Sequence, residues 1–177
     1  MLYCKQYKNM LYLIGFMGVG KTTIGKLFAL QKNLKFIDID KEIELRYQQS
    51  ILDIYKNKGE EYFRKLETEV LVSISNSQVV ACGGGLPIYN NNMSFIKNSG
   101  KSIYLKATNK KLFERLVDNF KKRPLIKNMT KKHLNKFIKE ELTKREKIYS
   151  MADYTIDISD LSKKDILRKI NSLIISF

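Results

Sequence analysis

Short apolar runs alternate along the chain with longer stretches in which apolar residues recur every three or four positions. The runs, which are typical of buried strands, lie at residues 11–14, 34–37, 79–82, 102–105 and 154–156. The longer stretches predict helices at residues 23–32, 42–47, 51–57, 60–75, 91–98, 110–120 and 130–150, with a last helix that begins at Ser162. Strands that alternate with helices in this way favour an α/β fold with a mostly parallel sheet.

The first predicted strand leads directly into a glycine-rich loop at residues 15–23. Two glycines five positions apart are followed there by Lys21 and Thr22. This is the P-loop pattern, in which glycines let backbone N–H groups face a polyphosphate, the lysine approaches the β- and γ-phosphates and the hydroxyl can ligate Mg²⁺. A strand before the loop and a helix after it disfavour the alternative of a plain glycine-rich turn. We expect the triphosphate of ATP to contact Gly18, Val19, Gly20, Lys21, Thr22 and Thr23.

Length and composition predict one globular domain over residues 1–177, because 44% of the residues are hydrophobic and only two are proline. Residues 1–10 precede the first strand and are expected to form an N-terminal extension. No apolar run approaches the ~20 residues of a membrane span, and the N-terminus lacks the apolar centre of a signal peptide. We therefore expect a cytoplasmic protein without a membrane partner.

The chain has 33 Lys and Arg against 18 Asp and Glu, a net charge of +15. Such a charge can mark a nucleic-acid surface or merely reflect a lysine-rich proteome, and it would also attract small anionic substrates. The basic runs are short and are not interleaved with aromatic residues, so no nucleic-acid partner is expected. Cys4 and Cys82 lack metal-ligand spacing and only one histidine is present, which argues against zinc and favours free thiols. Nothing in the pattern indicates an extended apolar interface, and we expect a monomer.

Further polar groups fall at the carboxyl ends of the predicted strands, where ligands gather in a parallel sheet. Asp38 and Asp40 end the second strand, and strand alternation predicts that both carboxylates lie on one side. Residues 83–85 are three glycines after the third strand, so their amides have no side chains to keep a ligand away. Arg145 lies on an otherwise apolar helix face formed by Leu134, Ile138, Leu142 and Tyr149, so we expect an anion beside it.

Together these motifs resemble the shikimate kinase family. The resemblance extends in order over residues 11–175 and rests on the P-loop and on Asp38-Ile39-Asp40, Phe63-Arg64-Lys65-Leu66-Glu67, Gly83-Gly84-Gly85, Arg123-Pro124-Leu125 and Arg145 with Tyr149 and Ala152-Asp153. It implies a three-layer sandwich with a five-stranded parallel sheet, as in nucleoside-monophosphate kinases, and a mobile lid at about residues 121–130. The implied reaction transfers the γ-phosphate of ATP to the 3-hydroxyl of shikimate in aromatic amino-acid biosynthesis.

The resemblance also implies a role for each polar residue. Lys21 would bind the β- and γ-phosphates, and Arg123 would descend with the lid onto ATP and the transferring phosphoryl group. Thr22 would ligate Mg²⁺ directly and Asp38 through water. Asp40 would accept the proton of the attacking hydroxyl. Shikimate itself would be held by Asp40, Arg64, Arg145 and the backbone N–H groups of Gly84 and Gly85.

Several alternatives remain open at this point. Arg64 has Glu60 and Glu67 at helical spacing and can simply form ion pairs with them, and Asp38 or Asp40 can serve only as a helix cap. Arg123 can belong to a solvated loop. Another small-molecule kinase, for gluconate or a nucleoside monophosphate, and an ATP-dependent nucleic-acid-binding protein are the competing functions.

Two positions depart from the family pattern. Cys82, directly before the three glycines, is hypothesised to make the site sensitive to thiol reagents. Where some family members place an arginine over the adenine, near Ser162, this chain offers Lys163 instead.

Overall fold

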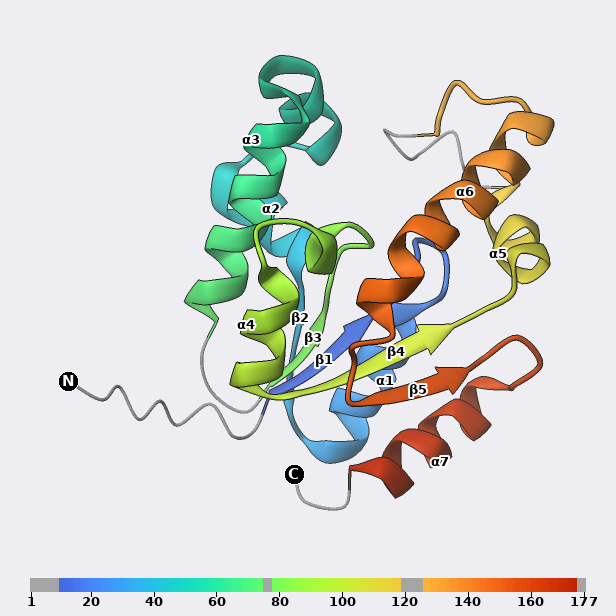
Figure 1. Ribbon diagram of the computed structural model, residues 1–177. Helices are drawn as coiled ribbons and strands as arrows, with labels where there is room; N and C mark the ends of the chain where they lie inside the picture. The colour runs from blue at the N-terminus through green and yellow to red at the C-terminus, as the bar shows by residue number, and fades with distance from the viewer. Residues whose placement is uncertain (1–9, 75–77, 119–125, 175–177) are drawn as a thin grey trace.

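A computed structural model describes residues 10–74, 78–118 and 126–174 of the chain (Figure 1). Its five strands form one parallel sheet with the order β2-β3-β1-β4-β5. The strands are β1 (Met10–Ile14), β2 (Lys35–Asp38), β3 (Gln78–Ala81), β4 (Lys101–Lys106) and β5 (Tyr154–Asp157). Because β1 lies between β3 and β4, the loop that follows β1 starts at the centre of the sheet, where the strand order reverses and ligands commonly bind.

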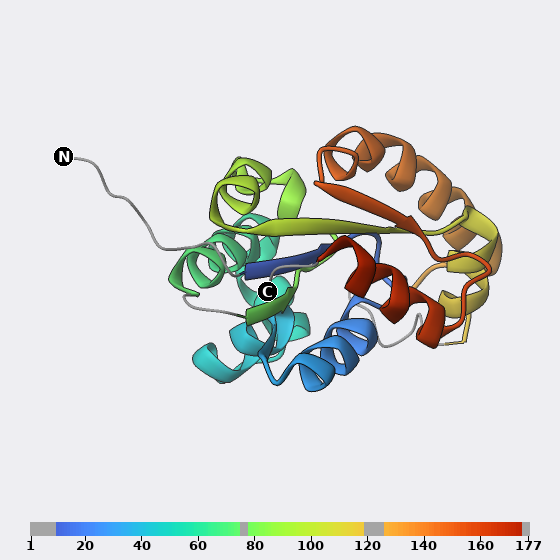
Figure 2. The same cartoon turned by 90° about the horizontal axis from the view of Figure 1, so that it is seen from below.

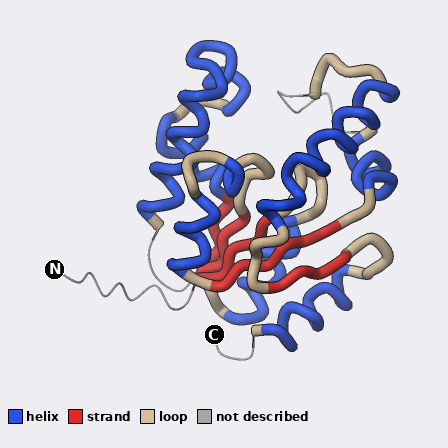
Figure 3. Tube along the Cα trace, viewed as in Figure 1, coloured by secondary structure: helices blue, strands red, loops and turns tan. Residues whose placement is uncertain are grey.

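Helices cover both faces of the sheet, with α1 and α7 on one face and α3, α4 and the end of α6 on the other (Figures 1 and 2). Figure 3 shows the resulting helix, sheet and helix layers. The helices are α1 (Lys21–Lys32), α2 (Ile39–Tyr47), α3 (Ile51–Ser73), α4 (Asn92–Ser99), α5 (Asn109–Leu116), α6 (Lys131–Tyr149) and α7 (Lys163–Leu173), with a short 3₁₀ helix η1 at Leu86–Ile88. The predicted three-layer α/β sandwich with a five-stranded parallel sheet is confirmed.

Alternation along β1 divides the core into two apolar clusters. Leu11 and Leu13 face the cluster that includes residues of α1 and α7, whereas Tyr12 and Ile14 face the cluster of α2, α3 and α4. All four side chains are buried, as expected for a central strand with helices on both sides.

Local capping explains several helix boundaries. The hydroxyls of Ser50, Thr130 and Ser162 each accept a hydrogen bond from a backbone N–H three residues later, as is typical of N-caps. Gly59, with φ of 80°, interrupts α3 and separates the two helical segments that the sequence predicts. No helix of the described residues is long and apolar enough to cross a membrane.

Two sequence-based expectations require correction. Met10 belongs to β1 and is buried, so the N-terminal extension does not include it. Asp38 is the last residue of β2 and its carboxylate caps α2, accepting from Lys41 N at 3.3 Å, whereas Asp40 lies in the first turn of α2. Strand alternation therefore was the wrong reason to place these two carboxylates together, because a helix begins directly after the first of them.

The predicted lid at residues 121–130 is described only in part. Ile126 is buried in the core and Thr130 caps α6, so the described end of this segment is attached to the body of the protein. Arg123 lies outside the described residues, and its role stays a prediction.

Candidate active site

The P-loop folds around its own lysine. Gly20 has φ of 105° and caps α1, a conformation that other L-residues rarely adopt. Lys21 Nζ donates hydrogen bonds to the carbonyl oxygens of Gly15 at 2.8 Å and Phe16 at 3.0 Å, and the side chain is almost fully buried. The loop thus combines an ammonium group with the amides of a helix N-terminus, which is an anion-binding arrangement.

Thr22 and Asp38 lie side by side at the edge of this loop. The Thr22 hydroxyl donates to Asp38 Oδ2 at 2.6 Å. These two oxygens suit Mg²⁺, which binds few protein groups and completes its octahedral coordination with water and phosphate oxygens.

The three glycines at residues 83–85 lie at the centre of the site, each against a different group. A Cβ atom on Gly83 would stand 2.9 Å from Asp40 Oδ1 and 2.3 Å from Glu67 Oε1. A Cβ on Gly84 would lie 3.1 Å from the P-loop nitrogen of Met17, and one on Gly85 would lie 2.5 Å from Arg64 Nη1. Because residues 83–85 have no side chains, α2, α3 and the P-loop can approach the backbone of this loop closely.

Arg64 is buried between two carboxylates of its own helix. Its Nη1 donates to Glu67 at 2.6 Å, and Nη2 donates to Glu60 at 2.8 Å. Both ion pairs that the sequence allowed are therefore present, although Arg64 is buried rather than on the surface. Burial raises the pKa of Glu67 to about 7, in spite of the attraction of Arg64.

Arg145 approaches the glycines from α6, on the other side. Its Nη1 donates to the carbonyl oxygen of Gly84 at 3.4 Å, and the Tyr149 hydroxyl donates to the same oxygen. Nη2 pairs with Glu141 at 2.5 Å, and the guanidinium carbon lies 5.5 Å from the centre of the Phe16 ring. The predicted buried helix face around Arg145 is observed, and the anion beside the arginine is Glu141.

A cavity of about 370 Å³ lies between the P-loop and the first two of the three glycines, and Arg64 and Arg145 do not line it. Its wall is formed by the P-loop, Asp38, Asp40, Gly83, Gly84 and Arg115. The described residues that the sequence predicts for the site thus line this cavity or contact residues 83–85, except Val19, which lines a second cavity on the other side of the P-loop.

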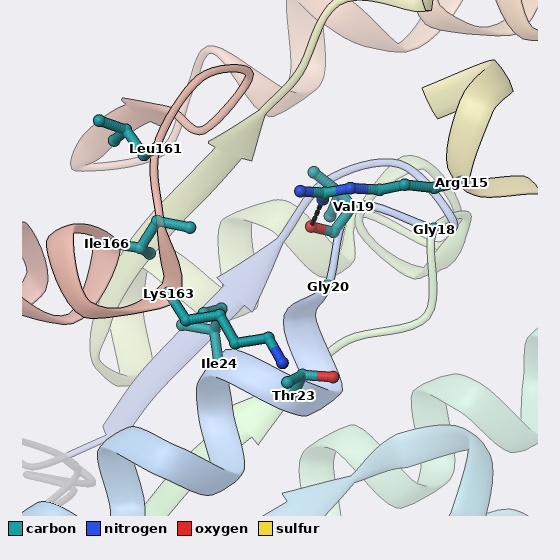
Figure 4. Close-up of a pocket in the computed structure, with 9 residues that line it drawn as sticks. All are labelled: Gly18, Val19, Gly20, Thr23, Ile24, Arg115, Leu161, Lys163 and Ile166. Carbon is teal, nitrogen blue, oxygen red and sulfur yellow. Dashed lines mark hydrogen bonds between the residues drawn. The ribbon is translucent and has the colours of Figure 1, made fainter. Parts of the chain in front are cut away.

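A second cavity, of about 280 Å³, adjoins the P-loop on the side of α7 (Figure 4). Lys163 lines it, together with Arg115, which sequence reasoning missed. Arg115 Nη1 donates to the carbonyl oxygen of Val19 at 2.8 Å. The only signal in the sequence was a basic residue in the last turn of a helix, which is common and indicates no particular site.

Cys82 also lines the cavity, but it is buried. The side chain is 2% exposed, and burial raises the pKa of the thiol well above its usual range. A protonated, enclosed thiol reacts slowly with thiol reagents, so the structure favours an inert Cys82 over the sensitive one hypothesised above.

The model of the shikimate kinase family matches residues 17–174 of the chain. The chain belongs to the shikimate kinase family. A shikimate kinase from Azobacteroides pseudotrichonymphae is 40% identical over 163 residues, which cover 90% of this chain and 96% of that protein. The crystal structure of shikimate kinase from Bacteroides thetaiotaomicron matches with a TM-score of 0.89 and 32% identity, over 95% of this chain and 99% of that one. Shikimate kinase from Acinetobacter baumannii, solved in complex with shikimate, has a TM-score of 0.87 and 32% identity, over 95% and 93% of the two chains.

Membership of the shikimate kinase family confirms the predicted enzyme class, an ATP-dependent phosphotransferase. It decides against the gluconate or nucleoside-monophosphate kinase and against the nucleic-acid-binding protein as the function of the chain. The high net charge is consequently better explained as a field that attracts two anionic small substrates.

Proposed function

We propose that this chain transfers the γ-phosphate of ATP to the 3-hydroxyl of shikimate, with shikimate bound beside residues 83–85. The observation that carries the proposal is the position of this glycine segment. Gly84 lies against the P-loop, where ATP would bind. The segment also contacts the carboxylates of Asp40 and Glu67, the hydroxyl of Tyr149 and the guanidinium groups of Arg64 and Arg145. A small hydroxylated acid bound there would present its carboxylate to cations and its hydroxyl to the nucleotide.

The carboxylate of shikimate would lie between Arg64 and Arg145. Both guanidinium groups contact the same three-residue segment, and each is almost fully buried. Planar guanidinium groups suit a planar carboxylate because two parallel N–H···O bonds fix both its charge and its orientation. The backbone N–H groups of Gly84 and Gly85 would add donors to the same site.

The hydroxyl to be phosphorylated would lie at Asp40, on the side of the cavity that leads to the P-loop. Asp40 would accept the proton of this hydroxyl. Phosphoryl transfer needs mainly positioning and positive charge, because negative charge is spread over the phosphate oxygens in a loose transition state. Lys21 lies in the loop to supply such charge, and Arg123 would add to it from the lid.

The same proposal assigns the metal site. Thr22 would ligate Mg²⁺ through its hydroxyl, and Asp38 would hold one of the water molecules around the ion. When bound, Mg²⁺ would neutralise charge on the β- and γ-phosphates. The hydrogen bond between Thr22 and Asp38 supports this assignment, since it keeps the two oxygens adjacent.

The test is a coupled assay of ADP release with purified protein, ATP and Mg²⁺. Addition of shikimate should raise the rate saturably above the background. Arg64→Ala and Arg145→Ala should each raise the KM for shikimate at least about tenfold, because a charge-assisted pair contributes ~1.5–3 kcal/mol, and should leave the KM for ATP within twofold. A parallel loss of ATP affinity in both variants would contradict the assigned roles.

We also propose that the enzyme is a monomer in the cytoplasm. Exposed large apolar side chains, such as Leu30, Leu45 and Val72, lie on three different helices, which supports a protein without a dimer interface. The buried free thiol of Cys82 suits a reducing compartment. Light scattering should give a mass near 20.7 kDa for a monomer, and a mass of twice that value would overturn the proposal.

A further inference from the structure

Both arginines of the proposed carboxylate clamp hold a carboxylate from four residues earlier on the same helix. Glu60 Oε1 accepts from Arg64 Nη2 at 2.8 Å and from Nε at 3.2 Å. Glu141 Oε2 accepts from Arg145 Nη2 at 2.5 Å. Residues four apart lie on one helix face, so each glutamate can pair with its arginine when no substrate is bound. An incoming carboxylate therefore meets two guanidinium groups that are already paired.

Arg64 has little room for an additional ligand. Glu67, which is 1% exposed, holds Nη1, and Gly85 lies against the guanidinium group from Nη1 to Nη2. The ring of Tyr89 lies 4.4 Å from the guanidinium carbon. Two of the described groups around Arg64 are exposed, the side chain of Glu60 at 46% and Tyr89 at 37%, and the Tyr89 hydroxyl donates to Glu60 Oε1 at 3.1 Å. Of the two, the Glu60 carboxylate is the one that accepts from Nε and Nη2. A carboxylate from solution can form a two-pronged contact with Nε and Nη2 only by replacing Glu60.

Glu141 has the corresponding position beside Arg145. Its side chain is 18% exposed, and its other oxygen accepts from Lys144 Nζ at 2.9 Å. Burial alone would raise the pKa of Glu141, but the hydrogen bond from Lys144 and the charge of Arg145 lower it. Glu141 is therefore ionised at neutral pH and competes with any anion for Arg145. Lys144, whose side chain is 70% exposed, remains available to pair with Glu141 after displacement.

We propose that Glu60 and Glu141 are specificity-determining residues, which occupy the carboxylate clamp until the substrate carboxylate displaces them. This inference rests on the proposed role of Arg64 and Arg145 in binding shikimate. A glutamate on the same helix acts at a high effective concentration, so a simple anion that binds only one guanidinium group is excluded. Shikimate can displace both glutamates because its hydroxyls gain contacts at Asp40 that a simple anion lacks. The glutamates thus lower the affinity for every carboxylate, so that a ligand binds well only if it has additional contacts, such as those of the shikimate hydroxyls at Asp40.

The chain offers matched pairs of glutamates for test and control substitutions. Glu60→Gln and Glu141→Gln remove the competing charge and keep a side chain of the same shape. Their controls are Glu61→Gln and Glu140→Gln, adjacent exposed glutamates that pair with Lys65 at 3.6 Å and with Lys136 at 3.8 Å. Each control makes the same change in net charge on the same helix, but away from the clamp.

The measurements are the KM and kcat for shikimate at saturating ATP and the inhibition constant of acetate. Glu60→Gln and Glu141→Gln should each lower the shikimate KM about twofold to fivefold, as expected for the loss of a partly exposed ion pair. Inhibition by acetate should strengthen by a similar factor, while kcat and the KM for ATP stay within twofold. The controls should change none of these values.

An unchanged or raised shikimate KM in both Glu60→Gln and Glu141→Gln would overturn the proposal. Thermal unfolding of each variant shows whether it is folded. The two glutamates lie on different helices, so if one variant does not fold, the other decides the test. Failure of this inference is distinguishable from failure of the proposed function. If Arg64→Ala and Arg145→Ala raise the KM but the two glutamine variants do not lower it, the clamp stands without place-holding glutamates. If the arginine variants leave the KM unchanged, both proposals are wrong.

Discussion

Gly85→Ala perturbs Arg64 beside the proposed binding site of the substrate carboxylate. The backbone at Gly85 has φ of −92° and ψ of −22°, which alanine adopts without strain, so the substitution acts only through its added methyl group. That methyl would stand 2.5 Å from Arg64 Nη1 and 2.7 Å from both Cζ and Nη2. Glu60 and Glu67 hold the guanidinium group in place, so it has to move by about an ångström against these ion pairs, a contact of the kind that overpacking studies place at ~1–3 kcal/mol.

If that cost falls on substrate binding, the KM for shikimate rises about fivefold to 150-fold, since 1.4 kcal/mol corresponds to a factor of ten. The assay is the initial rate of ADP release as a function of shikimate concentration at saturating ATP. The KM for ATP should not change, because the methyl group faces Arg64 and not the P-loop. Gly59→Ala is the control, because Gly59 lies on α3, the helix that carries Arg64, and no atom lies within 4 Å of the added methyl. The substitution should reduce stability through the positive φ of Gly59 without changing the KM for shikimate. A normal shikimate KM in Gly85→Ala would refute the assignment of Arg64 to the substrate.

Two further predictions concern buried groups of the site. The pKa of Glu67 is raised in the folded state to about 7, so folding favours the protonated form and stability is lost as pH rises from about 4.5 to 7. Urea titrations of the protein and of Glu67→Gln measure the free energy of unfolding of each. The value for the protein minus the value for Glu67→Gln should fall by ~3 kcal/mol between pH 4.5 and pH 8. An equal difference at both pH values would mean that folding does not shift the pKa of Glu67. Cys82 should react with a thiol reagent at least about a hundredfold faster in denaturant than in the native state, measured in a Cys4→Ser background so that one thiol is read. Rapid native labelling with loss of activity would show instead that Cys82 is accessible.

The layers of the fold could be predicted from the sequence because strand and helix periods are local properties. The P-loop was equally accessible, since its glycines and lysine are required at fixed spacing by the backbone geometry around a phosphate. The position of Asp40 was not accessible in the same way. A helix that starts directly after a strand makes Asp38 a cap and turns Asp40 toward Gly83, and the alternation of a strand does not describe that turn.

Contacts between distant segments were the part that the sequence could not supply. Arg115 reaches Val19 because α5 packs beside the P-loop, and nothing in the residues around Arg115 distinguishes it from other basic residues at a helix end. The pairing of Glu60 with Arg64 was visible as a spacing of four residues, but the sequence did not reveal that this pair is partly buried beside Gly85. Such features depend on which helix faces lie inward, and this is decided by the packing of the whole domain.

The central claim is that one carboxylate, two guanidinium groups and three glycines form the binding site of shikimate beside the P-loop. A crystal structure of the protein with ADP, Mg²⁺ and shikimate tests it most directly. The account predicts the shikimate carboxylate between Arg64 and Arg145, with Glu60 and Glu141 moved away, and a ring hydroxyl within hydrogen-bond distance of Asp40. Shikimate bound elsewhere, or bound with Asp40 out of reach of every hydroxyl, would contradict it.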